Sequence, residues 1–321
     1  MAQINKNALL CICVPIYNRM DYLDRMLSRF LEDKDLFDNT INLIISDNCS
    51  QEDLQSCCKT YQDQGLNLFY HRNKNNLGSN GNFIWCFNHT VGKYTWLLGS
   101  DDIPQKGNLR KLLNYLKDKE YGLFHLSVIP QSRDLTFFKD GNQMMEAVSY
   151  WITFMSSNIL LTSTLTSIDL IPYKETWLVQ VPAYLNACYS SSENAILDSR
   201  QFFESNTDAA NNGGYNIFEV FVSNLYGIYN EFVLKDLLSK ETFNRLIKVE
   251  YKDFLVGYII NLLIFRQESN FELSGGWTAL RNYYGNKLYA YYYLFVAILK
   301  RFFKAQLSIL ISIQSIFLFS R

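Results

Sequence analysis

The sequence predicts an α/β fold in which a doubly wound sheet is flanked by helices. Short apolar runs of strand length alternate with helical patterns through the first 128 residues. The run Tyr94–Leu98 is continuously apolar or strand-forming, as is typical of a strand buried on both faces. Polar clusters follow these runs at their ends. Alternation of strands and helices favours a parallel sheet with helices packed on both of its faces.

Five strands are expected in this half, at Ala8–Ile16, Ile41–Ile45, Leu66–Tyr70, Tyr94–Leu98 and Tyr121–Val128. The segment after the first strand has helical periodicity, with apolar residues spaced 3, 1, 3 and 1 apart: Leu23, Met26, Leu27, Phe30 and Leu31. The sheet and its helices therefore account for residues 8–128.

Polar residues recur where these strands end, at Tyr17–Arg19, Asp47, Asn75–Asn82 and Asp101–Asp102. The carboxyl ends of parallel strands share one edge of a sheet, and ligands of open α/β sheets bind there. Ordinary turn chemistry is the alternative, because Gly, Ser, Asp and Pro cluster in turns. That alternative requires four independent coincidences, so a binding site at this edge is the better interpretation.

Asp101 and Asp102 stand side by side directly after the strand Tyr94–Leu98. Two adjacent carboxylates repel each other unless a cation lies between them. Hard divalent cations such as Mg²⁺ or Mn²⁺ prefer oxygen ligands of this kind. The pair is therefore a candidate metal site.

Composition narrows the class of protein. A formal net charge of −1, from 30 basic and 31 acidic residues, argues against nucleic acid as a partner. The seven cysteines lie mostly in apolar runs without paired ligand spacing, which favours buried thiols in a reducing compartment over zinc. The N-terminus lacks the pattern of an export signal, so a cytoplasmic location is expected.

The second half of the chain has a less regular pattern. Helices are expected at Met144–Phe154, Lys174–Tyr189, Glu231–Lys240 and Tyr251–Phe265, strands at Ser156–Leu161 and Asn194–Phe203, and a flexible turn at Asn211–Tyr215.

Leu288–Leu299 consists of twelve apolar or aromatic residues, followed by Lys300, Arg301 and Lys304 and by the interrupted apolar segment Ala305–Phe319. Neither apolar segment has the roughly 20 residues of a spanning helix. Tyrosines beside basic residues suit the headgroup layer of a membrane. We expect an amphipathic anchor on the inner membrane face; the alternative is a helical pair packed on the body of the protein or on another subunit.

The motifs resemble those of family 2 glycosyltransferases. The similarity rests on Val14–Arg19, Ser46–Asn48, Asn76–Gly78 and Leu97–Asp102, and it is strong over residues 8–128 and weak after about 160. It is closest to the branch that includes abequosyltransferases and other enzymes of bacterial surface polysaccharides such as O-antigen and capsule, which Ser157–Asn158 and Asn212–Tyr215 also resemble. The resemblance implies a GT-A fold, a nucleotide-sugar donor and a divalent metal, Mg²⁺ or Mn²⁺.

The resemblance also implies roles for individual residues. Pro15, Tyr17 and Arg19 would line the nucleotide pocket, Asp47 would accept a hydrogen bond from the base, and Asn76, Gly78 and Asn82 would approach the ribose and diphosphate. Asp101 would hold the ribose or a metal-bound water, and Asp102 would bind the metal.

Two departures from the family pattern concern the chemistry. Gly99 stands where many relatives carry a further Asp, and the third metal ligand, often a His in relatives, is unassigned. The Glu-Asp pair that supplies the base for the acceptor hydroxyl is not found. Candidates for that base are Glu193, Asp198 and Asp169, and nothing in the sequence selects one of them.

The resulting prediction divides the chain into a nucleotide-sugar-binding half (1–128), an acceptor-binding half (129–230) and a helical C-terminal region (231–321). The predicted activity is metal-dependent, inverting transfer of a sugar, of the hexosyltransferase type, to a lipid-linked or polysaccharide acceptor. One alternative is a sugar nucleotidyltransferase, although Cys13–Pro15 lacks the glycine-rich loop with Lys or Arg that such enzymes carry. The other is a non-catalytic scaffold at the membrane that retains only the donor pocket.

Overall fold

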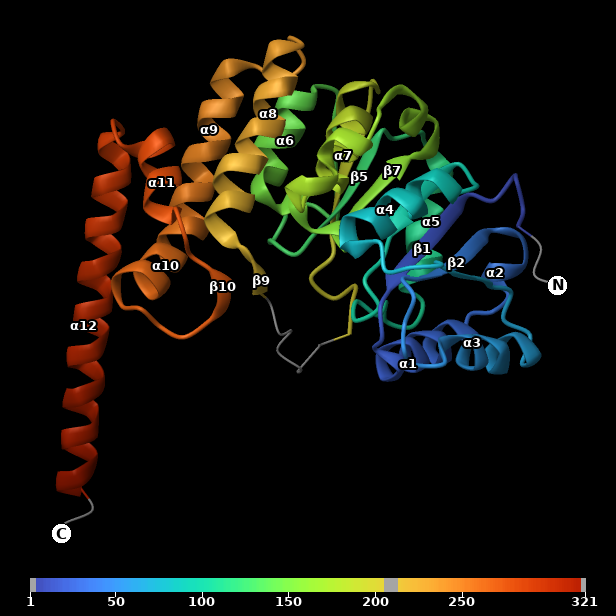
Figure 1. Cartoon of the computed structure of the whole chain (residues 1–321), viewed down its shortest axis with the longest axis horizontal. Helices are drawn as coiled ribbons and strands as arrows, with labels where there is room; N and C mark the ends of the chain where they lie inside the picture. Colours follow the sequence, from blue (N-terminus) through green and yellow to red (C-terminus); the bar gives the residue numbers. More distant parts are fainter. Residues whose placement is uncertain (1–3, 205–212, 319–321) are drawn as a thin grey trace. The chain divides into compact units, whose positions relative to one another are not determined.

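The computed structural model of the chain describes residues 4–204 and 213–318 and divides into two compact units (Figure 1). The first unit comprises Met1–Ala209 with Ile228–Ser239, and the second comprises Ala210–Gly227 with Lys240–Arg321. The boundary predicted at residue 128 lies inside the first unit, because the sheet continues across it.

The first unit is built on an eight-stranded sheet in the order β3-β2-β1-β4-β7-β5-β8-β6. The strands are β1 Leu10–Ile16, β2 Ile41–Asp47, β3 Phe69–Arg72, β4 Tyr94–Leu97, β5 Leu123–Ser127, β6 Leu135–Phe138, β7 Asn158–Leu161 and β8 Asn194–Asp198. Strands β1 to β4 are parallel, whereas β7 runs antiparallel between β4 and β5. The predicted α/β fold is confirmed, with all five N-terminal strands present, and the antiparallel β7 makes the sheet mixed.

Helices of the first unit cover the sheet through their apolar faces: α1 Met20–Leu31, α2 Leu36–Asn39, α3 Leu54–Asp63, α4 Gly78–His89, α5 Asn108–Asp118, α6 Gly141–Val148 and α7 Gln180–Tyr189. Helix α1 buries Leu23, Met26, Leu27 and Phe30, as the spacing of these residues predicts. Strand β4 is buried along its whole length, as its continuous apolar run predicts.

Three predicted helices have different bounds because the backbone turns left-handed where the sequence pattern continues. The helix predicted from Met144 ends at Val148, since Ser149 has φ 52°. The helix predicted from Lys174 begins only at Gln180, because Trp177 has φ 62° and follows a short 3-10 segment. The helix predicted at Glu231–Lys240 is wrong. Helix α8 (Leu225–Leu234) ends before Asp236, which has φ 55°, and α9 (Lys240–Glu250) begins after it.

The second unit is helical, with a small sheet of β9 (Gly213–Asn216) paired with β10 (Asn270–Glu272). The turn predicted at Asn211–Tyr215 lies partly outside the described residues, and its described part belongs to β9. The predicted helix at Tyr251–Phe265 is present, as wide π-helical turns around α10 (Val256–Tyr258). Helix α11 (Gly276–Tyr284) then leads to α12 (Leu288–Leu318).

The two apolar segments near the C-terminus form one helix, α12, of 31 residues, and not the pair of helices considered from the sequence. Within residues 4–204 and 213–318, none of the helices combines the length and the apolarity required to cross a bilayer.

Glu250 is a buried carboxyl group in the second unit, only 1% exposed, beside the hydroxyls of Tyr226 and Tyr284. Burial raises its pKa well above the ordinary value. The folded protein thus binds this proton more tightly than the unfolded chain, so the free energy of unfolding falls as pH rises from the carboxyl's ordinary range towards the raised pKa.

We therefore expect Glu250→Gln to raise the Tm at neutral pH by a few degrees, on the order of 1 kcal/mol, because the amide carries no charge to bury. The gain should shrink as the pH falls into the ordinary range of a carboxyl group, because the unfolded wild-type chain then becomes protonated as well. Thermal unfolding across this range measures it, with the exposed Glu241→Gln on the same helix as the matched control. A loss of stability in Glu250→Gln at every pH would contradict the assignment.

Candidate active site

A cleft of about 430 Å³ opens in the first unit at the carboxyl ends of β1 and β4. It brings together seven residues predicted from the sequence: Pro15, Tyr17, Arg19, Asn76, Gly78, Asn82 and Asp101. Met155 and Trp177, from the second half of the chain, also line it. Residues that are far apart in the sequence therefore meet at the edge where parallel sheets bind their ligands.

Arg19 places a cation at this cleft. Asn18 and Arg19 have φ values of 56° and 66°, so the chain makes a left-handed turn between β1 and α1. Through this turn Arg19 reaches Asp101, with 3.4 Å between Nη1 and Oδ2, while its side chain remains about half exposed. A partly exposed guanidinium in this position can pair with a phosphate oxygen as well as with Asp101.

Helix α4 directs its N-terminus at the same cleft, because Gly78 and Ser79 line it. The loop before α4 is fixed by asparagines: Asn48 donates to Asn76 (2.8 Å) and accepts from the amide of Leu77 (2.9 Å). Gly78 has φ 73°, a conformation that favours glycine. A rigid loop leading into a helix N-terminus suits an anionic group such as a diphosphate.

Asn82 fixes the first turns of α4 to the sheet. Its Oδ1 accepts hydrogen bonds from Ser46 (2.6 Å) and from Asn73 (2.9 Å), and its Nδ2 donates to the Ser46 carbonyl (3.0 Å). These bonds are buried. The geometry gives Asn82 a role in holding the cleft wall in place.

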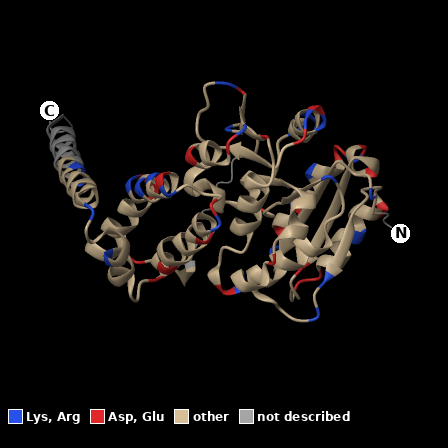
Figure 2. Cartoon of the chain, turned by 90° about the horizontal axis from the view of Figure 1, so that it is seen from above, with Lys and Arg blue, Asp and Glu red and all other residues tan. Residues whose placement is uncertain are grey.

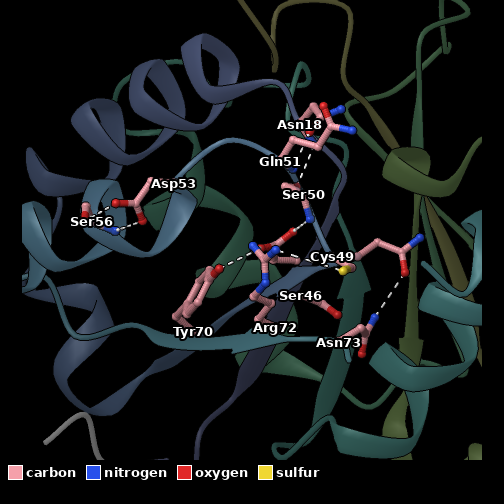
Figure 3. A network of polar contacts seen from close by, with 12 residues as sticks. Asn18, Ser46, Cys49, Ser50, Gln51, Asp53, Ser56, Tyr70, Arg72 and Asn73 are labelled. Carbon is pink, nitrogen blue, oxygen red and sulfur yellow. Dashed lines mark hydrogen bonds and ion pairs between the residues drawn. The ribbon is translucent and has the colours of Figure 1, made fainter. Parts of the chain in front are cut away.

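Asp47 lies behind this wall, fully buried at the end of β2. Its carboxylate accepts hydrogen bonds from the hydroxyl of Tyr70 (2.6 Å), from Nη1 of Arg72 (3.1 Å) and from the Ser50 amide (2.8 Å). Tyr70 and Arg72, both labelled in Figure 3, donate to this carboxylate from the neighbouring strand. Burial, followed by the hydrogen bond to Asp47, raises the pKa of Tyr70, so its hydroxyl stays a donor at neutral pH.

Tyr70 and Arg72 were not predicted from the sequence. They alternate along β3, and Arg72 stands opposite Asp47 in the parallel register. A base that bonded to Asp47 would replace one of these donors, and Arg72 can move because its side chain is 44% exposed.

Asp101 and Asp102 converge above Gly99. A Cβ added at Gly99 would lie 3.0 Å from Oδ1 of Asp101 and 2.9 Å from Oδ2 of Asp102. The glycine therefore leaves the space that the two carboxylates occupy, which accounts for its presence where an acid was expected. Burial is the main cause of a raised pKa at Asp102, the charge of Asp101 adds to it, and Ser156 and Arg19 oppose it.

The acidic pair fits a divalent cation that is shared with a substrate. Oxygens of both carboxylates approach the same side of Gly99, and burial disfavours the charge on Asp102. No cluster of three or more His, Cys, Asp or Glu side chains suited to a metal occurs within the described part of the chain. Mg²⁺ commonly binds through one or two carboxylates and completes its shell with substrate phosphates and water.

The structure provides no histidine as a third ligand. Buried His125 bonds to Asn158, and its burial lowers its pKa to about 4, so it is neutral at physiological pH. His71 and His89 stack on opposite sides of Trp85, with ring centroids 4.1 and 4.0 Å from the indole. All three histidines of the chain thus have other contacts.

The three carboxylates considered as catalytic bases are not among the residues that line the cleft. Glu193 pairs with Lys119 at 3.0 Å and lines a different hollow. Asp198 pairs with Arg200 at 2.9 Å, which lowers its pKa to about 2 and makes it a weak base. Asp169 accepts a hydrogen bond from the amide of Ile171.

Glu175 is a carboxylate beside the cleft that the sequence did not suggest. It lines an adjoining hollow of about 220 Å³, whose residues Gly78, Ser79 and Trp177 also line the cleft. The segment carrying it is fixed to α4, because Asn80 donates to the carbonyl of Lys174. Glu175 was not predicted from the sequence, in which Lys174–Tyr189 has the pattern of one helix.

A parallel-stranded core with a cation, a helix N-terminus and an acidic pair at its carboxyl edge is typical of α/β proteins that bind anionic ligands. The model of the family described as "Glycosyl transferase family 2" matches residues 11–173, just over half of the chain. The chain belongs to this family, and the recognition made from the sequence motifs is confirmed.

A curated relative, abequosyltransferase RfbV from Salmonella typhimurium (strain LT2), is 33% identical over 109 residues. The match covers 34% of this chain and about a third (32%) of the relative. It agrees with the branch of the family that the motifs resemble.

Solved structures share the fold. TarS 1–349 from S. aureus in complex with UDP-GlcNAc aligns with a TM-score of 0.64 at 14% identity, covering 85% of this chain and 80% of that one. The mannosyltransferase PcManGT from Pyrobaculum calidifontis, in complex with GDP-Man and Mn²⁺, aligns at 0.52 with 11% identity, covering 94% and 90%. The predicted GT-A fold is confirmed, and membership of the family supports a glycosyltransferase.

Proposed function

We propose that this glycosyltransferase moves a sugar from a nucleoside-diphosphate sugar to a lipid-linked or polysaccharide acceptor in bacterial surface polysaccharide synthesis, with inversion and with a divalent metal. The observation that carries the proposal is the convergence of Arg19, the N-terminus of α4 and Asp101 on one cleft, whereas Asp102 does not line the cleft but approaches Gly99, which does. The similarity to an abequosyltransferase supports the acceptor class. The expected location is the cytoplasm, peripheral to the inner face of the cell membrane.

In this proposal Arg19 and the N-terminus of α4 bind the donor diphosphate, and Pro15 and Tyr17 contact the nucleoside. Asp102 and Asp101 hold Mg²⁺ or Mn²⁺, which would neutralise negative charge on the departing nucleoside diphosphate. The nucleotide sugars in the TarS and PcManGT complexes, and the Mn²⁺ in the latter, support this set of ligands.

We assign the catalytic base to Glu175. An inverting displacement needs a carboxylate that takes the proton of the acceptor hydroxyl as that hydroxyl attacks the anomeric carbon. Glu175 is exposed at the edge of the cleft, beside Trp177, and within the described structure its carboxylate forms no ion pair that would compete with that role. Glu193 and Asp198, in contrast, are held by Lys119 and Arg200.

A donor panel tests the proposal. The protein is incubated with CDP-, dTDP-, GDP- and UDP-hexoses, with Mg²⁺, with Mn²⁺ and with EDTA. Metal-dependent release of a nucleoside diphosphate from one donor is the expected result. Pyrophosphate chemistry would instead indicate a nucleotidyltransferase, and donor binding without any turnover, also in the presence of a lipid-linked acceptor extract, would indicate a scaffold.

A further inference from the structure

One face of α12 exposes a row of large apolar side chains. Leu288, Tyr292, Phe295, Leu299 and Phe302 are spaced 4, 3, 4 and 3 residues apart and are 86%, 63%, 60%, 38% and 57% exposed. At 3.6 residues per turn this spacing places them on one side of the helix. We call these five residues the α12 stripe; Tyr291 and Phe303, also exposed, flank it.

The other side of α12 packs within the second unit. Ala290 is 4% exposed, and its carbonyl accepts a hydrogen bond from Tyr251. Arg301 bonds to Asn261 and lies over the ring of Phe265, with 4.3 Å between Cζ and the ring centroid. The helix is therefore already held by this side, and the α12 stripe is the side without such packing in the described structure.

The charged residues in the sequence around the α12 stripe are all basic. From Gly276 to the end of the chain the sequence has six basic residues and no acidic one. The basic residues are Arg281, Lys287, Lys300, Arg301, Lys304 and Arg321. In Figure 2 the described part of α12 carries Lys and Arg but no Asp or Glu. A protein of net charge −1 thus carries a locally cationic segment.

An exposed apolar stripe beside basic residues favours an anionic lipid surface, and not a second copy of the chain, as the partner of α12. Two copies of α12 would bring like charges together, without the acidic partners that paired helices use at the edges of their seam. Tyr and Phe rings beside Lys and Arg suit the headgroup layer, where rings insert and cations meet anionic phosphates. No helix among the described residues could span the bilayer, so the contact would be parallel to the surface.

We propose that the α12 stripe, with Lys300 beside it, is the docking surface for an anionic phospholipid membrane. The stripe residues insert among the headgroups, and the basic residues contact lipid phosphates. This inference goes beyond sugar transfer and does not depend on it, because the surface lies outside the cleft residues and its test measures binding alone.

The test is flotation of the full-length protein with vesicles of phosphatidylcholine, and of phosphatidylcholine with phosphatidylglycerol. We expect binding to the anionic vesicles that weakens at high salt. Replacing Tyr292, Phe295 and Leu299 together by Ser should weaken binding at least about tenfold, because the apolar area that inserts is lost. Lys300→Gln should weaken it less, and only for the anionic vesicles.

Leu234→Ser, at an apolar position of the first unit that is 76% exposed, is the matched control and should bind like the wild type. Circular dichroism establishes that each variant is folded. The proposal is overturned if the folded triple variant floats as well as the wild type, or if neutral vesicles bind equally well. It is also overturned if light scattering without lipid shows a dimer that the triple variant converts to a monomer, since the stripe would then bind a second copy.

Discussion

Replacement of Asp102 by alanine is expected to abolish donor turnover, a loss of about a thousandfold or more, while the protein stays folded. The carboxylate is assigned to the cation that neutralises the departing diphosphate, and charge stabilisation of this kind contributes several kcal/mol to a transition state. The fold should tolerate the change, because burial already raises the pKa of Asp102 and its charge is unfavourable in the folded protein. Nucleoside diphosphate release and thermal unfolding measure the two effects.

Asp118→Ala is the matched control, because this exposed acid at the end of α5 is not among the cleft residues. Gly99→Ala tests the role of the carboxylates of Asp101 and Asp102 independently. Its Cβ would come within 3.0 Å of both carboxylates, so they must move, and a higher metal concentration should be needed for half-maximal turnover. Unchanged sugar transfer in folded Asp102→Ala would remove the basis of the proposed metal site.

Glu175→Gln is expected to lower kcat by about 10²- to 10⁴-fold, the range over which a positioned general base contributes. The KM for the donor should change little, because the diphosphate contacts are assigned to Arg19 and α4 and not to this residue. Steady-state kinetics at saturating metal, with the donor and the acceptor varied in turn, separates the two parameters.

Glu193→Gln is the control for Glu175, since Glu193 is paired with Lys119 and lines another hollow. If Glu175→Gln retains full kcat and Glu193→Gln does not, the base has been assigned to the wrong residue.

The cleft at the carboxyl edge of the sheet shows which features of the site can be predicted from local sequence patterns. Apolar runs and helical spacing depend on neighbours along the chain, so they locate β1, β2 and β4 and place Asp101 and Asp102 at the end of β4. Seven predicted residues meet in one cleft because they follow parallel strands, whose carboxyl ends lie at one edge of the sheet. In contrast, the helix predicted at Glu231–Lys240 was wrong, since its apolar pattern did not reveal the left-handed turn at Asp236.

The sequence by itself determined the order of strands and helices in the first half, the family, and the position of the acidic pair at a strand end. Only the tertiary structure decided which groups meet across the fold: Tyr70 and Arg72 on Asp47, Glu175 beside the start of α4, and the stripe that α12 leaves exposed. The physical reason is that periodicity is a property of consecutive residues. Partners of a buried carboxylate or of a helix face depend instead on strand register and on packing between segments far apart in the chain.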